Sequence, residues 1–167
     1  MLHLLDANVL ITASNMYYPL DVVPEFWEWI DHHATNGRIK LPDEVLDEVL
    51  AGGKKEDPLL DWITARKDVL RLKEKVDPSL VNKVVTEGYA PDLKDDELIE
   101  IGQDPFLIAY GLAKPDERCV VTVEVSSPSK KRQNRKIPDV CKHFGVRCQI
   151  PFQLYRSLGF STAWKKS

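Results

Sequence analysis

The hydrophobic pattern opens with a near-continuous apolar run over residues 1–11, in which leucines dominate. Such a run is typical of a strand that is buried on both faces of a parallel sheet. Asp6 interrupts the run, and Asn8 follows two residues later. The carboxyl ends of strands in open α/β sheets face the ligand crevice, so a strand here predicts a carboxylate in a binding site. Taken alone, Asp6 fits a helix N-cap or a turn equally well.

Along the rest of the chain, apolar residues at helical spacing alternate with short apolar stretches. Strands alternating with helices predict an α/β fold, which we expect to be a three-layer α/β/α arrangement around a central, mostly parallel sheet. The pattern predicts strands at residues 1–11, 38–41, 118–125 and 146–150, and helices that begin near Pro24, Pro42, Asp104, Ile137 and Phe152, with a loop over residues 12–21.

Residues 54–103 form the least informative part of the sequence. Leu59, Leu60 and Ile63 suggest one helix, and residues 80–85 suggest another. We expect this segment to be a helical excursion between the second and third strands. The sequence shows no internal repeat and no linker, so residues 1–167 are predicted to form one domain.

The composition is that of an ordinary globular protein, with 43% hydrophobic and 29% charged residues and a net charge of −3. No apolar run approaches the length of a membrane span and no leader precedes the first strand, so we expect a cytoplasmic protein without a membrane partner. Cys119, Cys141 and Cys148 are odd in number and lack CxxC spacing. They are predicted to be reduced, buried thiols.

Three further carboxylates occupy positions that suit a site. Glu48 follows Val45 by three residues and precedes Val49, at the border of an apolar helical stripe, where it either reaches solvent or binds a cation. Asp104 precedes a proline and an apolar helix, as a helix cap also would. Thr122 and Glu124 share one face near the end of a β-branched strand, which also suits a solvated edge strand.

On the predicted sheet, Asp6, Asp104 and Glu124 fall on one rim, meaning the edge where the carboxyl ends of the strands lie. Glu48 lies on a flanking helix. Carboxylate oxygens without histidine or cysteine are hard ligands that suit Mg²⁺ or Mn²⁺. Like charges packed without cations would not all remain ionised. Two such ions about 3.5–4 Å apart can clamp the attacking and leaving oxygens of a phosphodiester displacement.

Positive charge is concentrated in one segment, because five of the seven residues in 130–136 are basic. A charge run of this kind is most often a solvated, flexible turn. It also suits contact with backbone phosphates, which carry no sequence information. The candidate RNA-binding residues are Lys130, Lys131, Arg132, Arg135 and Lys136.

The order and spacing of these motifs resemble those of PIN-domain nucleases over most of the chain, residues 54–103 excepted. The family's opening strand that ends in Asp-x-Asn is matched by Asp6 and Asn8. Its proline followed six residues later by an acid is matched by Pro42 and Glu48. Its aspartate opening an apolar helix is matched by residues 104–113, and its strand ending in Val-Thr-x-Asp by residues 120–124.

The fourth motif departs from the family pattern, since Glu124 replaces aspartate and no Asp-Phe follows. The basic segment and residues 136–146, together with Tyr17-Tyr-Pro and Phe26-Trp-Glu-Trp29, resemble a prokaryotic PIN-like subfamily, the DUF4411 type. The altered motif puts one metal position in doubt, although the longer glutamate side chain can still reach.

The resemblance implies a Mg²⁺- or Mn²⁺-dependent ribonuclease, in prokaryotes usually the VapC-like toxin of a toxin–antitoxin pair. By analogy, the metal ligands are Asp6, Glu48, Asp104 and Glu124, while Asn8 and Thr122 position a ligand or water. A divalent ion then activates water for in-line attack on phosphorus. The implied partners are an RNA substrate and an antitoxin protein, and the sequence leaves open whether the protein forms a homodimer.

Two other functions are consistent with parts of the pattern. A PIN-like module that binds RNA or protein without cleaving it would explain Glu124 and the basic segment. An aspartyl phosphotransferase or receiver-like switch would use a similar sheet. However, a haloacid dehalogenase-type phosphatase needs an aspartate where Asn8 stands, and a receiver domain has no use for Glu48.

Overall fold

The computed structural model describes residues 1–52 and 56–166, and within them four parallel strands form one sheet. The strands are β1 (Leu2–Leu5), β2 (Ile39–Lys40), β3 (Arg118–Val121) and β4 (Arg147–Gln149). They are arranged in the order β2-β1-β3-β4. In register, Leu5 of β1 lies opposite Val121 of β3, and Val120 lies opposite Cys148 of β4. The α/β class and the parallel sheet are therefore confirmed.

The prediction that the first strand runs to residue 11 was wrong. The strand ends at Leu5, and α1 (Ala7–Thr12) follows it. A π-helical turn (Ala13–Tyr17) then occupies part of residues 12–21, where a loop was expected. The Asp6 amide donates the last ladder bond, to the Val121 carbonyl at 2.9 Å. Beyond that bond β3 has also ended, so the chain has no strand to pair with and forms helical hydrogen bonds instead.

Between β2 and β3 the described residues are mainly helical, as expected for the excursion. The elements are α3 (Asp43–Gly52), α4 (Pro58–Leu70), α5 (Pro78–Lys83), a π-helical turn (Val84–Tyr89), α6 (Asp95–Ile101) and α7 (Asp104–Ala113). Residues 54 and 55, where the excursion was predicted to begin, lie outside the described residues. The other helical elements are α2 (Pro24–Thr35), a 3₁₀ turn (Arg132–Asn134), α8 (Ile137–Phe144), α9 (Pro151–Ser157) and a 3₁₀ turn (Trp164–Lys166).

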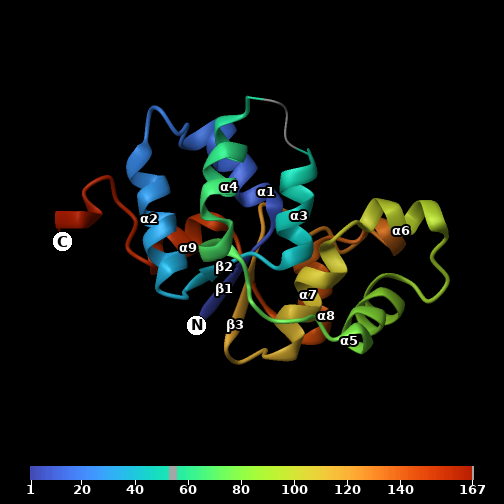
Figure 1. The fold of residues 1–167 in the computed structure, drawn as a ribbon. Coiled ribbons are helices and arrows are strands. Elements are labelled where there is room, and N and C mark those ends of the chain that lie inside the picture. Colours follow the sequence, from blue (N-terminus) through green and yellow to red (C-terminus); the bar gives the residue numbers. More distant parts are fainter. Residues whose placement is uncertain (53–55, 167) are drawn as a thin grey trace.

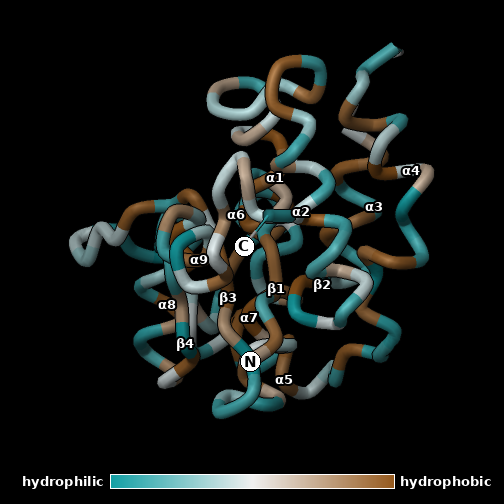
Figure 2. Tube along the Cα trace, turned by 90° about the vertical axis from the view of Figure 1, so that its left-hand side faces the viewer, coloured by the Kyte–Doolittle hydropathy of each residue, from teal (hydrophilic) through white to brown (hydrophobic). Residues whose placement is uncertain are grey.

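The sheet lies between two helical layers, with α2 and α9 on one side and α7 and α8 on the other (Figure 1). Figure 2 shows that the hydrophobic segments include β1, β3 and α7 in the middle of the molecule. On the α2 side, aromatic rings fill the layer, since Tyr18 stacks on Phe26 at 4.3 Å between ring centroids and Trp29 meets Tyr155 edge-on at 5.8 Å. The contact between Trp29 and Tyr155 joins α2 to α9.

The three cysteines are free thiols. Cys119 and Cys141 are buried, as predicted, whereas Cys148 is only partly buried. Among the described residues, no helix combines the length and the apolar character that a membrane crossing requires.

Candidate functional site

The candidate site lies where the two central strands end. From β1 the chain passes to β2 on one side, whereas β3 and β4 lie on the other side, so the strand order reverses between β1 and β3. Such a switch point is where ligands bind in open α/β sheets. Asp6 and Thr122 are the residues that follow β1 and β3, and the Thr122 hydroxyl donates a 2.8 Å hydrogen bond to Asp6 Oδ2.

Asp6 is a buried carboxylate, with 5% of the residue exposed. It occupies the N-cap position of α1, but its side chain makes no capping hydrogen bond and instead accepts the bond from Thr122. Burial raises the pKa of Asp6. Its hydrogen bond with Thr122 and the nearby amides of Asn8 and Ala7 lower the pKa, while Glu124 raises it. The carboxylate therefore belongs to the rim and not to the helix cap.

Glu48 approaches the rim from α3, which packs against α1 and α7. Although the residue is largely exposed, its Oε1 lies 3.6 Å from the point where a β-carbon on Gly102 would stand. Partial burial and then the charge of Asp6 raise the pKa of Glu48. Its carboxyl end thus shares the electrostatic environment of Asp6, close to the start of α7.

Asp104 is the first residue of α7, and Gln103 takes the N-cap position that the sequence had suggested for Asp104. Burial, followed by the charges of Asp6, Glu124 and Glu48, raises the pKa of Asp104 to about 8, while Lys136 opposes the shift. The Asp104 carboxyl group is therefore largely protonated at neutral pH when no cation is present.

Glu124 differs from the other three because both of its oxygens have partners. Lys136 Nζ donates to Oε1 at 2.8 Å, and the amide of Ile137, the first residue of α8, donates to Oε2 at 2.8 Å. The Glu124 amide in turn donates to the Thr122 hydroxyl at 3.1 Å. β3 ends at Val121, three residues before Glu124, so both Thr122 and Glu124 lie beyond the strand that was predicted to contain them.

The four carboxyl groups lie near enough to influence one another's charge. They do not form a ready-made metal coordination shell. The pKa of Asp104 responds to Asp6, Glu48 and Glu124. Nevertheless, within residues 1–52 and 56–166, no three or more side chains of His, Cys, Asp or Glu lie in an arrangement that would hold a metal ion. Their hard oxygen donors and mutual repulsion suit a divalent cation chemically. Joint metal ligation by these residues stays a prediction.

Asn8 lies on α1 beside this rim. It is exposed and lines a cavity of about 430 Å³, to which Glu48, Asn15 and Asp57 also contribute. Asn8 and Glu48 thus face a common solvent-filled space. This geometry is compatible with the predicted role of Asn8 in positioning a ligand or water, which stays a prediction.

The basic segment is anchored to the protein at several points and is not a freely solvated turn. Arg132 donates to Glu97 at 2.7 and 2.8 Å and to Asp92 at 2.7 Å. Arg135 donates to the carbonyl of Gly88, and Lys136 to Glu124. Among the described residues, Lys130 and Lys131 take part in no salt bridge. Of the predicted RNA-binding side chains, these two are the least held by hydrogen bonds and salt bridges within the protein.

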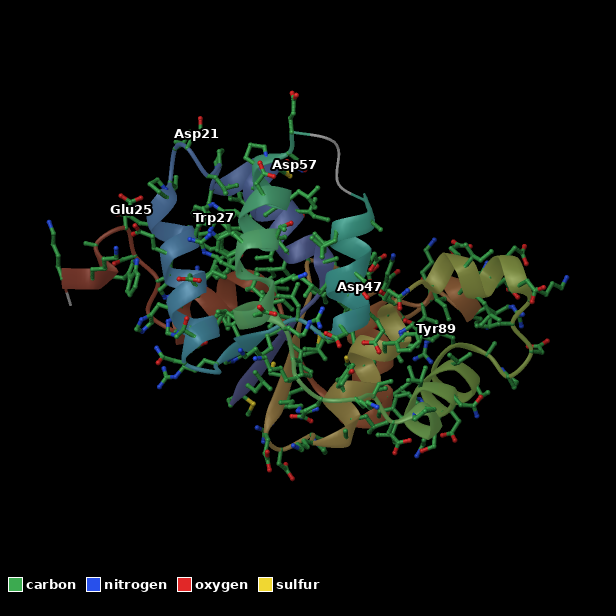
Figure 3. The ribbon with its side chains drawn as sticks, viewed as in Figure 1. Asp21, Glu25, Trp27, Asp47, Asp57 and Tyr89 are labelled. Atoms are coloured by element: carbon green, nitrogen blue, oxygen red, sulfur yellow. The ribbon has the colours of Figure 1, made fainter. Side chains whose placement is uncertain are left out.

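Sequence reasoning missed Tyr89, which ends the π-helical turn next to α7 and α8 (Figure 3). The residue is 6% exposed, and its hydroxyl has no hydrogen-bond partner among the described residues. Burial and then the charges of Asp104 and Glu124 raise its pKa. Nothing in the local pattern of residues 84–89 distinguishes Tyr89 from an ordinary core tyrosine, so only the fold reveals its place at the site.

Comparison with known proteins gave one family match. The model of the family described as a domain of unknown function, DUF4411, matches residues 3–162. Comparisons with curated proteins and with solved structures each found no match.

Proposed function

The chain belongs to the DUF4411 family, and we propose that this protein is a Mg²⁺- or Mn²⁺-dependent ribonuclease that hydrolyses RNA phosphodiester bonds. The observation that carries the proposal is the group of acids where β1 and β3 end: Asp6 accepts a hydrogen bond from Thr122 there, and Asp104 lies near enough for its pKa to be raised to about 8 by burial and by the neighbouring carboxylates. Acids grouped at a sheet's switch point, one of them strongly perturbed, indicate a functional site. The resemblance of three motifs, and of the Val-Thr part of the fourth, to those of PIN-domain nucleases supports the choice of reaction.

In this proposal the side chains of Asp6, Glu48 and Asp104 hold the ion, with Glu124 as the fourth carboxylate of the rim. A bound ion would supply Lewis-acid polarisation of the phosphodiester and of the attacking water. Thr122 orients Asp6 through its hydroxyl hydrogen bond, and Asn8 faces the cavity from which water and substrate approach. The protein mainly aligns the reactants and balances charge.

The biological setting rests on the resemblance alone. We propose that the protein acts in the cytoplasm as the toxin of a prokaryotic toxin–antitoxin pair, with an antitoxin protein as its partner. Lys130 and Lys131 extend the RNA contact beyond the carboxylates through backbone phosphates.

A second candidate is a PIN-like module that binds RNA or protein without cleaving it. The observation that favours it is that both carboxylate oxygens of Glu124 accept hydrogen bonds within the protein, from Lys136 and from the amide of Ile137. Such a module would retain RNA binding and give no cleavage.

The test compares the parent protein with Asp6→Asn. Asn keeps the shape and an oxygen that accepts from Thr122, but lacks the charge that holds a cation. Added Mg²⁺ or Mn²⁺ is expected to raise the melting temperature of the parent by binding the native state, and to raise that of the variant much less. Single-stranded RNA is expected to be cleaved by the parent only. Asp21→Asn, at an exposed loop remote from the rim, is the matched control (Figure 3).

Two results decide between the candidates. If the parent shows no metal response and no cleavage while RNA still binds, the binding module replaces the nuclease. Equal metal response and equal cleavage in the parent and Asp6→Asn would remove Asp6 from the site.

A further inference from the structure

The partners of Glu124 give the site a fixed positive charge. Lys136 Nζ lies 2.8 Å from Glu124 Oε1, while Oε2 accepts from the first amide of α8. The N-terminus of a helix carries partial positive charge. A divalent ion placed on this carboxylate would therefore meet positive charge at both oxygens, which is unfavourable at such short range.

The position of Lys136 is fixed by its surroundings on both sides. On its N-terminal side, Arg135 donates to the carbonyls of Gly88 and Asp139, and Arg132 is held by Glu97 and Asp92. On its C-terminal side, α8 begins at Ile137. The neighbours of Lys136 in the chain are thus held by hydrogen bonds, and its ammonium lies beside Glu124, with Asp104 and Glu100 as further carboxylates that raise its pKa.

Two further observations indicate that this place receives a ligand. The Lys136 side chain is 39% exposed, whereas the Glu124 side chain is 22% exposed. In the π-helical turn, which packs against α7 and α8, the buried hydroxyl of Tyr89 has no partner among the described residues, and the charges of Asp104 and Glu124 raise its pKa. Both residues are donors, which suits an anionic oxygen ligand.

We propose that Lys136 binds a non-bridging oxygen of the substrate phosphodiester, and that Glu124 is a positioning residue for Lys136 and not a metal ligand. The divalent ion is then held by Asp6, Glu48 and Asp104, and the ammonium of Lys136 supplies the positive charge that a second ion would otherwise bring. Lysine serves as a point charge for phosphate in this way. The inference rests on the proposed nuclease function and narrows it to a site for one ion.

The first experiment measures Mn²⁺ binding by titration calorimetry, without RNA, in the parent, Glu124→Gln and Asp104→Asn. One ion is expected to bind the parent. Glu124→Gln is expected to keep that stoichiometry and an affinity within about threefold, because it removes no ligand, whereas Asp104→Asn is expected to lose at least tenfold in affinity. Glu117→Gln, an exposed glutamate at the opposite end of β3, is the matched control for the lost charge.

The second experiment measures cleavage of single-stranded RNA at saturating Mn²⁺. Lys136→Met is expected to lower kcat by about 100-fold, as loss of one donor to a developing oxyanion does elsewhere. Glu124→Gln is also expected to lower kcat, while its Mn²⁺ affinity stays unchanged. Lys136→Arg is expected to keep part of the rate that Lys136→Met loses. Lys142→Met, on the exposed side of α8, is the matched control, and melting temperatures are recorded for all variants.

The outcomes separate this inference from the proposed function. If Glu124→Gln loses Mn²⁺ affinity as Asp104→Asn does, or if Lys136→Met cleaves at the parental rate, the assignment of Lys136 and Glu124 is overturned while the nuclease stands. Two Mn²⁺ ions bound by the parent would overturn the assignment as well. A parent that neither binds Mn²⁺ nor cleaves RNA would overturn both.

Discussion

Replacing Asp104 with asparagine tests the electrostatics of the site directly. In the folded protein the pKa of Asp104 is about 8, against an ordinary value of 3.8. Between these two values the folded state holds a proton that the unfolded state has released, so the free energy of unfolding falls as the pH rises. The shift of about 4 units sets a ceiling of roughly 6 kcal/mol on this loss, fully developed above about pH 8.

Asparagine has a similar shape and no proton to lose, so Asp104→Asn is expected to be more stable than the parent at high pH when no metal is present. The difference is expected to grow by at most ~1.4 kcal/mol per pH unit, which gives ~3 kcal/mol between pH 5.5 and pH 7.5. For a chain of this size that corresponds to about 6–12 °C in melting temperature.

The assay is urea unfolding of both proteins at several pH values in the presence of a chelator, with Asp21→Asn as the control for an exposed aspartate. Parallel pH profiles for the parent and Asp104→Asn would refute the raised pKa of Asp104. When the series is repeated with Mg²⁺, the free energy of unfolding of the parent at pH 7.5 is expected to rise by about 2.7 kcal/mol if the ion is at 100 times its dissociation constant.

Three further predictions concern other parts of the molecule. Thr122→Val is expected to lower the free energy of unfolding by about 1–3 kcal/mol and to weaken Mg²⁺ binding, because the buried Asp6 carboxylate loses its 2.8 Å donor; urea unfolding and calorimetry check both, and an unchanged metal affinity would show that Thr122 does not orient Asp6. Gly111→Ala is expected to destabilise the fold by about 1–3 kcal/mol without affecting metal affinity, because its β-carbon would lie 2.7 Å from Val146 Cγ1 and 3.1 Å from Val120 Cγ2; equal unfolding midpoints would contradict this. Neutralising Lys130 and Lys131 together is expected to flatten the salt dependence of RNA binding by roughly one unit of slope per lost phosphate contact. An unchanged slope would show that neither residue contacts a phosphate.

Sequence reasoning was least accurate at element ends. The apolar run of residues 1–11 does not distinguish a long strand from a strand of four residues followed by a helix, since leucine and valine suit both. The boundary at Leu5 depends on where the neighbouring β3 ends. In the same way, Asp104 proved to be the first residue of α7 and Gln103 its cap, a distinction of one residue that the Asp-Pro pair cannot make.

The sequence by itself determined the α/β class and the parallel sheet, because these depend on local hydrophobic period and on residues adjacent along the chain. Only the tertiary structure decided which side chains meet. Thr122 donates to Asp6 across 116 positions, and this pairing requires β1 and β3 to be neighbours. The ion pair of Glu124 with Lys136 and the buried hydroxyl of Tyr89 likewise arise from how α8 and the π-helical turn pack beside the rim. Charge and burial at a site are set by contacts between distant segments, and local sequence patterns do not contain that information.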